Sequence, residues 1–274
     1  MDPLAADNVL VEIEDGIAWV QLNRPEKRNA MSVGLAEDMN RVLDALEVDD
    51  RCGVIVLTGV GEAFSAGMDL KDFFRATDGV SDVERMRAYR STRAWQWRSL
   101  MHYAKPTIAM VNGYCFGGAF TPLICCDLAI AAEDATFGLS EINWGVIPGG
   151  VVSKAISTLM NDRKAMYYVM TGEKFDGARA ETLGLVNEAV PADRLRARTV
   201  ELAKVLLDKN PTVLRQARLA YKYARYMDWE QAAEYLTAKA DQTTFVDPER
   251  GREQGLKQFL DDKTYRPGHG TYSR

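Results

Sequence analysis

Strand-like runs of hydrophobic residues open the chain, and a helical pattern follows them. Residues 9–14 and 17–22 flank Asp15-Gly16, a two-residue turn signal, so we expect an antiparallel hairpin. Ser32 can cap a helix whose apolar side chains fall on one stripe, namely Leu35, Met39, Val42, Leu43 and Leu46. The chain is therefore expected to begin with two strands and an amphipathic helix.

Strand and helix patterns then alternate up to Pro191. The strands are predicted at 54–57, 107–111 and 128–131, and the helices at 82–102, 151–160 and 163–171. A glycine-punctuated loop follows the first of these strands, and the second runs directly into a glycine-rich segment. This alternation predicts an α/β core over residues 1–190.

Beyond Pro191 only helical patterns remain. They cover 193–207, 212–226, 229–243 and 250–262. We expect residues 191–274 to form a helical region that packs outside the sheet core, where it can contact a neighbouring subunit. The basic and aromatic stretch 215–225 is interpreted as a solvated helix face.

The composition predicts a soluble protein that folds without disulfides or metal. The chain has 274 residues, and 47% of them are apolar, which is ample for a sizeable core. His102 and His269 lie far apart and are assigned no role. The cysteines show neither disulfide-framework density nor paired metal spacing, and they are Cys52, Cys115, Cys125 and Cys126. We therefore expect no metal site and a reducing compartment; the adjacent cysteines either pack as small apolar residues or form a redox pair.

The overall charge argues against non-specific nucleic-acid binding. The formal net charge is −5 and the isoelectric point is near 5.3, although a local basic patch can still hold a phosphorylated ligand. Residues 1–7 lack a basic start with an apolar continuation, and no window approaches the roughly 20 apolar residues of a membrane span. We expect a cytoplasmic protein with neither nucleic acid nor membrane as partner.

Two glycine-containing loops carry the first candidate chemistry. Residues 66–69 and 117–119 lie where a strand gives way to a helix, and the start of a helix presents unpaired N–H groups. If the loops converge, the N–H groups of Met68 and Gly118 can hold a developing negative charge on a carbonyl oxygen. The alternative is that the glycines only permit tight turns or close helix packing.

Glu141 is the candidate acid–base residue. It lies in 137–145 (FGLSEINWG), before Trp144 and the apolar run 146–150. A carboxyl group in such surroundings is partly desolvated, which suits a group that must take and return a proton. The alternative is a structural glutamate that forms a salt bridge or caps a helix.

Five motifs in order resemble the crotonase (enoyl-CoA hydratase/isomerase) superfamily. They are 23–31 (NRPEKRNAM), 64–70 (FSAGMDL), 111–118 (VNGYCFGG), 126–129 (CDLA) and 137–141 (FGLSE). The resemblance covers essentially the whole chain. It implies a crotonase fold, that is, a superhelical core of stacked ββα turns and a helical C-terminal region that trimerises. It also implies an acyl-CoA thioester whose oxygen is held by the N–H groups of Met68 and Gly118.

Further segments are similar to the hydroxycinnamoyl-CoA (feruloyl-CoA) hydratase-lyases. They are 95–97 (WQW), 140–145 (SEINWG), 229–231 (WEQ) and 251–263 (GREQGLKQFLDDK). Such enzymes hydrate an aryl enoyl-CoA and cleave the product to an aromatic aldehyde and acetyl-CoA. Where ordinary hydratases carry a second glutamate, this chain has Thr121, so hydration relies on Glu141, with the Thr121 hydroxyl able to orient water.

The same resemblance implies the substrate-binding residues. Coenzyme A is part of the substrate, and no separate cofactor is implied. Lys27 and Arg28 are expected near its phosphates, although a solvated turn is the alternative. Ala66 and Leu70 are expected near its adenine and pantetheine arm, and Ala30 is a further expected substrate-binding residue.

The ring-binding end departs from the hydratase-lyase pattern. Phe73 and Thr237 stand where those enzymes hold the phenolic hydroxyl with tyrosines, so the aryl pocket is altered. Tyr114 and Tyr235 are the candidates for a replacement hydroxyl. The candidate pocket walls are Phe74, Trp95, Trp97 and Trp144, each of which can instead be ordinary core packing.

Three functions stay open at this stage. The first is hydration and cleavage of an aryl-propenoyl-CoA by a homotrimer or a dimer of trimers. The second is an enoyl-CoA hydratase or isomerase that stops before cleavage. The third is a non-catalytic or RNA-binding member of the fold, which the acidic balance and the presence of Glu141 disfavour.

Overall fold

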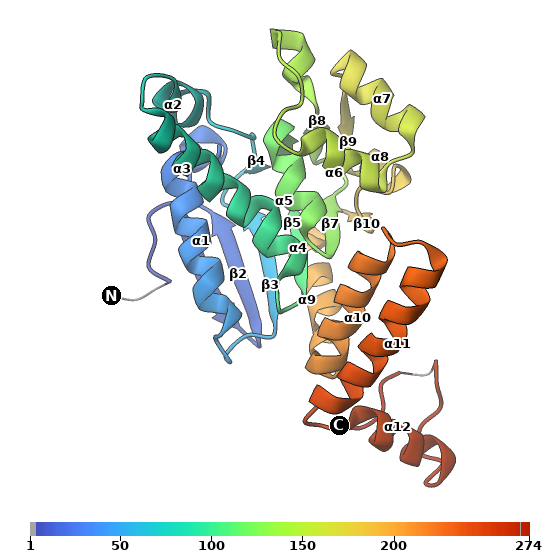
Figure 1. Cartoon of the computed structure of the whole chain (residues 1–274). Coiled ribbons are helices and arrows are strands. Elements are labelled where there is room, and N and C mark those ends of the chain that lie inside the picture. Colours follow the sequence, from blue (N-terminus) through green and yellow to red (C-terminus); the bar gives the residue numbers. More distant parts are fainter. Residues whose placement is uncertain (1–3, 269) are drawn as a thin grey trace.

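The structure is a computed structural model that describes residues 4–268 and 270–274. Two sheets form its centre (Figure 1). Residues 1–3 and His269 lie outside the described part. The larger sheet has the order β1-β2-β3-β5-β7-β10 and is parallel except for β1. Its strands are β1 (Val9–Glu14), β2 (Ile17–Leu22), β3 (Val54–Gly59), β5 (Thr107–Val111), β7 (Leu128–Ala132) and β10 (Glu188–Val190).

The predicted hairpin and first helix are confirmed. β1 pairs with β2 in antiparallel register, and Asp15 and Gly16 turn the chain with positive φ angles of 50° and 79°. The Ser32 hydroxyl accepts a hydrogen bond of 3.1 Å from the Leu35 N–H and so caps α1 (Val33–Glu47). The predicted apolar stripe of α1 is buried against the core.

A second, smaller sheet was not predicted, because its strands are only three residues long. Its order is β4-β6-β8-β9, with β4, β6 and β8 parallel and β9 antiparallel to β8. The strands are β4 (Ala63–Ser65), β6 (Tyr114–Phe116), β8 (Thr136–Gly138) and β9 (Lys174–Asp176). Each turn of the core thus gives one strand to each sheet, as β3/β4, β5/β6 and β7/β8.

This topology places the candidate site. β4, β6 and β8 are neighbours and run parallel, so their carboxyl ends meet at one edge of the small sheet. The loops that follow them contain Met68, Gly118 and Glu141 respectively. Three loops that are far apart in sequence therefore lie side by side at this edge of the small sheet.

Helices cover the sheets. The predicted helix 82–102 is continuous but changes form, as α3 (Asp82–Arg93), a π-helical stretch (Ala94–Ser99) and α4 (Leu100–His102). A second π-helical stretch, Leu70–Arg75, follows Met68 and leads into α2 (Ala76–Asp78). The remaining helices of this part are α5 (Phe120–Cys125), α6 (Val152–Leu159), α7 (Asp162–Thr171) and α8 (Gly177–Thr182).

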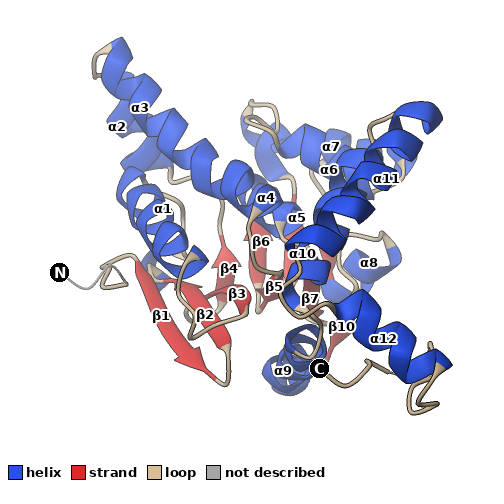
Figure 2. Cartoon of the chain, turned by 60° about the horizontal axis from the view of Figure 1, so that its bottom comes forward, coloured by secondary structure: helices blue, strands red, loops and turns tan. Residues whose placement is uncertain are grey.

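The C-terminal helices differ in where they pack. α9 (Leu195–Leu207) lies against β3, β5 and β7 on the face of the large sheet opposite to α1 (Figure 2). The helices that stand away from the sheets are α10 (Pro211–Ala224), α11 (Trp229–Val246) and α12 (Gly251–Leu260). The region expected outside the sheet core therefore begins at α10 rather than immediately after Pro191.

A buried ion cluster fastens α10 to the core. Asp127, just before β7, lies 2.6 Å from the Arg218 guanidinium and 2.5 Å from the Lys222 ammonium, and all three side chains are at least four-fifths buried. Asp127 also accepts hydrogen bonds from the N–H and hydroxyl of Thr107. The interpretation of 215–225 as a solvated face was thus wrong for Arg218 and Lys222, since their charge partner is distant in sequence.

Asp127→Ala should loosen α10. The substitution leaves two buried cations without their carboxylate, so we expect the free energy of unfolding to fall by about 3–5 kcal/mol. Urea unfolding followed by circular dichroism measures this change. Glu37→Ala, at an exposed position of α1, is the matched control and should alter stability by less than about 0.5 kcal/mol. Equal stability of the two variants contradicts the assignment.

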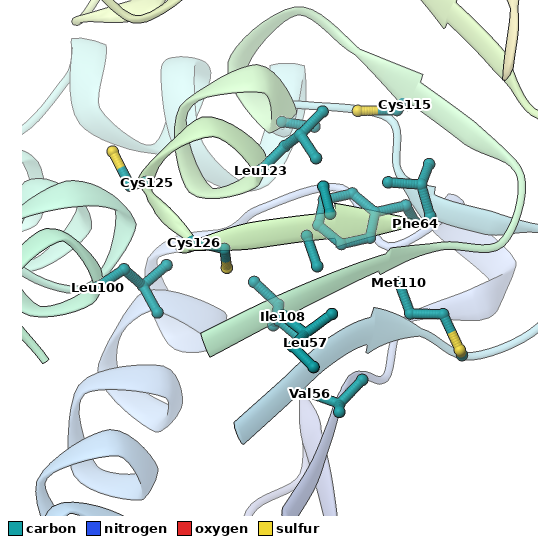
Figure 3. Packing of buried hydrophobic residues seen from close by; sticks show 14 of the residues in the cluster. Val56, Leu57, Phe64, Leu100, Ile108, Met110, Cys115, Leu123, Cys125 and Cys126 are labelled. Carbon is teal, nitrogen blue, oxygen red and sulfur yellow. The ribbon is translucent and has the colours of Figure 1, made fainter. Parts of the chain in front are cut away.

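The cysteines pack in the core. Cys52, Cys115, Cys125 and Cys126 are buried free thiols. Figure 3 shows the side chains of Cys125 and Cys126 pointing in different directions among apolar residues. Burial raises the pKa of the Cys125 thiol to about 12, so the thiolate that redox chemistry needs is disfavoured. The interpretation as small buried residues is confirmed.

Within residues 4–268 and 270–274, membrane-spanning helices and clusters of metal ligands are both absent. None of the helices there has the length and apolarity to cross a bilayer. In the same ranges, no group of three or more metal-ligating side chains comes together.

Candidate active site

The loops after β4 and β6 bring two backbone amides together. A Cβ atom added to Gly118 would lie 3.3 Å from the Met68 nitrogen, and one added to Gly67 would lie 3.1 Å from the Gly118 nitrogen. Gly67 also has a positive φ of 88°, a conformation that side chains disfavour. Glycine at these positions is therefore what allows the amides of Met68 and Gly118 to be neighbours.

Neither amide is used by the surrounding hydrogen bonds. Met31 and Met68 form an isolated parallel β-bridge. Its two hydrogen bonds are donated by the N–H of Met31 to the Gly67 carbonyl (2.8 Å) and by the N–H of Asp69 to the Met31 carbonyl (3.1 Å), so the Met68 N–H takes no part in it. Gly118 is the second residue of a 3₁₀ turn (Gly117–Ala119), where N–H groups have no partner within the helix. Two neighbouring donors that these bonds leave unused are the groups that stabilisation of an oxyanion needs.

Glu141 lies beside this pair. A Cβ atom on Gly117 would come within 2.7 Å of the Glu141 Oε1 atom, so the carboxyl packs against the turn that carries Gly118. Glu141 is 8% exposed, and its Oε2 atom is enclosed without a hydrogen-bond partner. Burial raises the pKa of the carboxyl, although a backbone hydrogen bond partly opposes this.

The structural alternatives for Glu141 are not supported. In the described part of the chain it forms no ion pair and caps no helix. The expected desolvation is present, since burial raises the pKa of the carboxyl. Among the apolar sequence neighbours, Leu139 is fully buried, whereas Trp144 and Ile147 are 51% and 78% exposed. The turn at Gly117, which the β6–β8 pairing brings close, packs against the carboxyl.

A buried arginine that sequence reasoning missed braces the Met68 loop. Arg24 donates to the Asp69 carboxylate (2.8 Å), the Ala30 carbonyl (2.6 Å) and the Asp72 carboxylate (2.6 Å). Asp69 in turn accepts from the N–H groups of Lys71 and Asp72 and caps the π-helical stretch. Burial alone would raise the pKa of Asp69, but these backbone bonds and Arg24 lower it below its usual range.

Asn29 and Ser65 complete the brace. Asn29 is fully buried with a positive φ of 56°, and its amide donates to the carbonyls of Val60 (2.9 Å) and Ala63 (2.7 Å). The Ser65 hydroxyl donates to the Asn29 carbonyl at 2.8 Å and accepts from the Gly67 N–H at 3.1 Å. In the sequence, Asn29 and Ser65 are marked only as members of two motifs, since no spacing reveals contacts between loops.

Most of the residues expected to bind coenzyme A lie at the surface. Lys27 and Arg28 are exposed, and Arg28 pairs with Glu62 at 2.9 Å and lies 4.8 Å from the centre of the Tyr114 ring. The Ala66 N–H donates to the Arg28 carbonyl at 2.8 Å. Ala66 and Leu70 are exposed and Ala30 is half-buried. Thr121 is buried in α5, one helical turn after Gly117.

The ring-binding candidates fall into two clusters. Phe73 is buried edge-on against Phe74 (5.5 Å between ring centres) and Tyr89 (5.0 Å). On α11, the Thr237 hydroxyl donates to the Ala233 carbonyl at 2.9 Å, and Tyr235 packs against Tyr223. Among the candidate walls, Trp95 is fully buried in the core, Trp97 packs against it, and Trp144 is half-exposed. Core packing is thus confirmed for Trp95.

Comparisons with known proteins agree with this architecture. A family model described as "Enoyl-CoA hydratase/isomerase" matches residues 12–266. The chain is 57% identical over 266 residues to a hydroxycinnamoyl-CoA hydratase-lyase of Pseudomonas fluorescens, covering 97% of this chain and 96% of that protein. It is 30% identical over 247 residues to a mitochondrial enoyl-CoA hydratase of Pongo abelii, covering 90% and 82%.

Solved structures show the same fold. A crystal structure of an enoyl-CoA hydratase from Bacillus anthracis superposes with a TM-score of 0.83 at 27% identity, covering 94% of this chain and 98% of that one. An enoyl-CoA hydratase structure from Geobacillus kaustophilus gives a TM-score of 0.84 at 28% identity. With its paired sheets, its three convergent loops and a family match along most of its length, the chain belongs to the enoyl-CoA hydratase/isomerase family, the crotonase superfamily.

Proposed function

We propose that this protein hydrates an aryl-propenoyl-CoA and then cleaves the β-hydroxy thioester to an aromatic aldehyde and acetyl-CoA. The observation that carries the proposal is the unpaired, buried Glu141 carboxyl beside the free N–H groups of Met68 and Gly118. The 57% identity to a hydroxycinnamoyl-CoA hydratase-lyase supports the choice of substrate.

Hydration uses both parts of the site. Ionised Glu141 takes a proton from water as the water oxygen bonds to the β-carbon of the enoyl thioester. The electron pair of the double bond moves to the thioester oxygen, and the N–H groups of Met68 and Gly118 stabilise the resulting enolate. Glu141 returns the proton to the α-carbon. The Thr121 hydroxyl is proposed to orient the water.

Cleavage uses the same groups again. Glu141 removes the proton of the β-hydroxyl, the Cα–Cβ bond breaks, and its electron pair forms the enolate of acetyl-CoA in the site of Met68 and Gly118. The β-carbon leaves as the aldehyde carbonyl. Glu141 then protonates the enolate carbon, which gives acetyl-CoA and restores the ionised carboxylate.

The coenzyme A part of the substrate is proposed to lie along the surface residues described above. Lys27 and Arg28 would pair with coenzyme A phosphates, and Ala30, Ala66 and Leu70 would contact the rest of the arm. At the ring end, Phe73 offers no hydrogen bond and the Thr237 hydroxyl is already bonded within its helix. Tyr114, Trp144 and Tyr235 remain candidates for this end.

The direct test is product analysis. Purified protein is incubated with feruloyl-CoA, p-coumaroyl-CoA and cinnamoyl-CoA, and aldehyde, acetyl-CoA and hydroxyacyl-CoA are separated by chromatography. We expect aldehyde and acetyl-CoA in equal amounts. A β-hydroxyacyl-CoA that accumulates without aldehyde identifies a hydratase instead, and RNA retention with no thioester turnover identifies a non-catalytic member of the fold.

The rate should depend on pH through Glu141. The cycle begins with the ionised carboxylate, so kcat/KM rises as pH rises through the pKa of Glu141. Because burial raises this pKa above its ordinary value of 4.5, the midpoint of the acidic limb should lie above that value. A pH profile of aldehyde formation measures it, and a midpoint at or below 4.5 contradicts the assigned role.

Assembly is proposed to complete the molecule. α10, α11 and α12 enclose a groove of about 650 Å³, and Trp229 and Phe245 on α11 are each 91% exposed. We propose that residues 191–274 form an oligomerisation region beside a catalytic core of 1–190, in a homotrimer or a dimer of trimers. Light scattering tests the assembly.

Four buried free thiols support the proposal of a cytoplasmic location, because thiols stay reduced in that compartment.

A further inference from the structure

A buried glutamine contacts the side chain of Met68. Gln96 is 7% exposed, and its side-chain amide donates to the sulfur atoms of Met31 (3.2 Å) and Met68 (3.4 Å). It comes from the π-helical stretch Ala94–Ser99, between Trp95 and Trp97, which both pack in or against the core. π-helical turns inside α-helices are rare and frequently occur at functional sites.

The side chain of Met68 connects this amide to both oxyanion donors. Its backbone supplies one N–H, while its Cγ atom lies 3.0 Å from where a Cβ of Gly118 would be. The Met68 side chain thus lies against Gly118 on one side and is hydrogen-bonded by Gln96 on the other. The Met68 side chain therefore lies between the Gln96 amide and the residue that carries the second N–H group.

Packing alone does not explain an amide at this position. Thioether sulfur is a weak acceptor, and burying a primary amide with weak partners costs more than burying a leucine of similar size. A leucine would fill the same space but would not fix the direction of the Met68 side chain. The hydrogen bonds to sulfur are the property that distinguishes Gln96 from an apolar residue here.

We propose that Gln96 is a positioning residue, which acts through the Met68 side chain to hold the N–H groups of Met68 and Gly118 at the spacing that an enolate oxygen requires. The inference rests on the proposed function, because it takes these two amides to be the enolate site. Gln96 itself need not touch the substrate. Its contribution is made in the transition state, where the oxygen carries the most charge.

The first test is kinetic. Gln96→Leu should lower kcat by about 10- to 100-fold with little change in KM, because misplaced donors cost transition-state stabilisation and not substrate affinity. Met68→Leu should have an effect of similar direction, and the double variant should be no slower than the slower single variant. Gln21→Leu, on β2, is the matched control and should retain full activity. An unchanged kcat in Gln96→Leu, or additive effects in the double variant, overturns the inference. If Gln96→Leu does not fold, Gln96→Met replaces it.

The second test needs no turnover. In a Glu141→Gln background, a bound cinnamoyl-CoA thioester should absorb at longer wavelength than in water, since the two N–H donors polarise its carbonyl. Adding Gln96→Leu should reduce this shift by at least half. An undiminished shift overturns the role of Gln96. If instead no red shift is seen before Gln96 is changed, or the wild-type protein turns over no aryl-CoA, the proposed function fails first.

Discussion

Glu141→Gln is expected to reduce kcat for aldehyde formation by about 10³- to 10⁴-fold. General acid–base catalysis contributes 10²–10⁴, and here one carboxyl serves both hydration and cleavage. The amide has nearly the same shape and stays next to Gly117, but it can neither accept nor return a proton. Steady-state measurement of aldehyde and acetyl-CoA with the substrate of highest turnover gives the ratio.

Stability provides the control for Glu141→Gln. A carboxyl whose pKa is raised in the folded state favours folding at pH values below its unfolded pKa, and that contribution is lost as pH rises through the folded pKa. The variant should therefore melt at or above the wild-type temperature near neutral pH. Full activity in a folded Glu141→Gln variant sinks the mechanism, whichever substrate proves correct.

Local signals explain why much of the fold was predictable. The turn at Asp15-Gly16, the cap at Ser32 and the stripe of α1 depend on residues close in sequence, and each prediction was confirmed. The loops of Met68 and Gly118 were visible because glycine permits what other residues do not.

Long-range contacts explain what was missed. Strands β4, β6 and β8 are too short for a hydrophobic pattern, yet their pairing creates the site. The partners Asp127 and Arg218 are brought together only by the fold. In the sequence, Gln96 is an ordinary polar residue between two tryptophans. Only the π-helical stretch of the folded chain brings its side chain to Met68. Candidate site residues could thus be proposed from the sequence, whereas the residues that pack against and hydrogen-bond to them could not.

Arg24→Met should damage stability and activity together. It removes the cation that faces Asp69, whose side chain is only 7% exposed, and breaking a buried pair from one side costs about 3–5 kcal/mol. The Ala30 carbonyl and the Asp72 carboxylate lose the same donor. Because Asp69 directly follows Met68, the loop that carries Met68 loosens as well, and we expect kcat to fall by at least about 10-fold. Urea unfolding and steady-state kinetics measure the two effects.

Two further variants separate the Arg24 brace from general damage. Arg24→Lys keeps the charge but lacks the planar fork that reaches Asp69, Asp72 and Ala30 at once, so it should recover only part of the lost stability. Arg41→Met removes a side chain that is 41% exposed, while its partner Asp38 keeps its hydrogen bonds from Asn8, so it should cost less than about 1 kcal/mol. If Arg24→Met unfolds no more easily than Arg41→Met, the buried pair does not brace the loop. The position of the Met68 N–H would then depend on the β-bridge to Met31 and on the contacts of Asn29, Ser65 and Gln96.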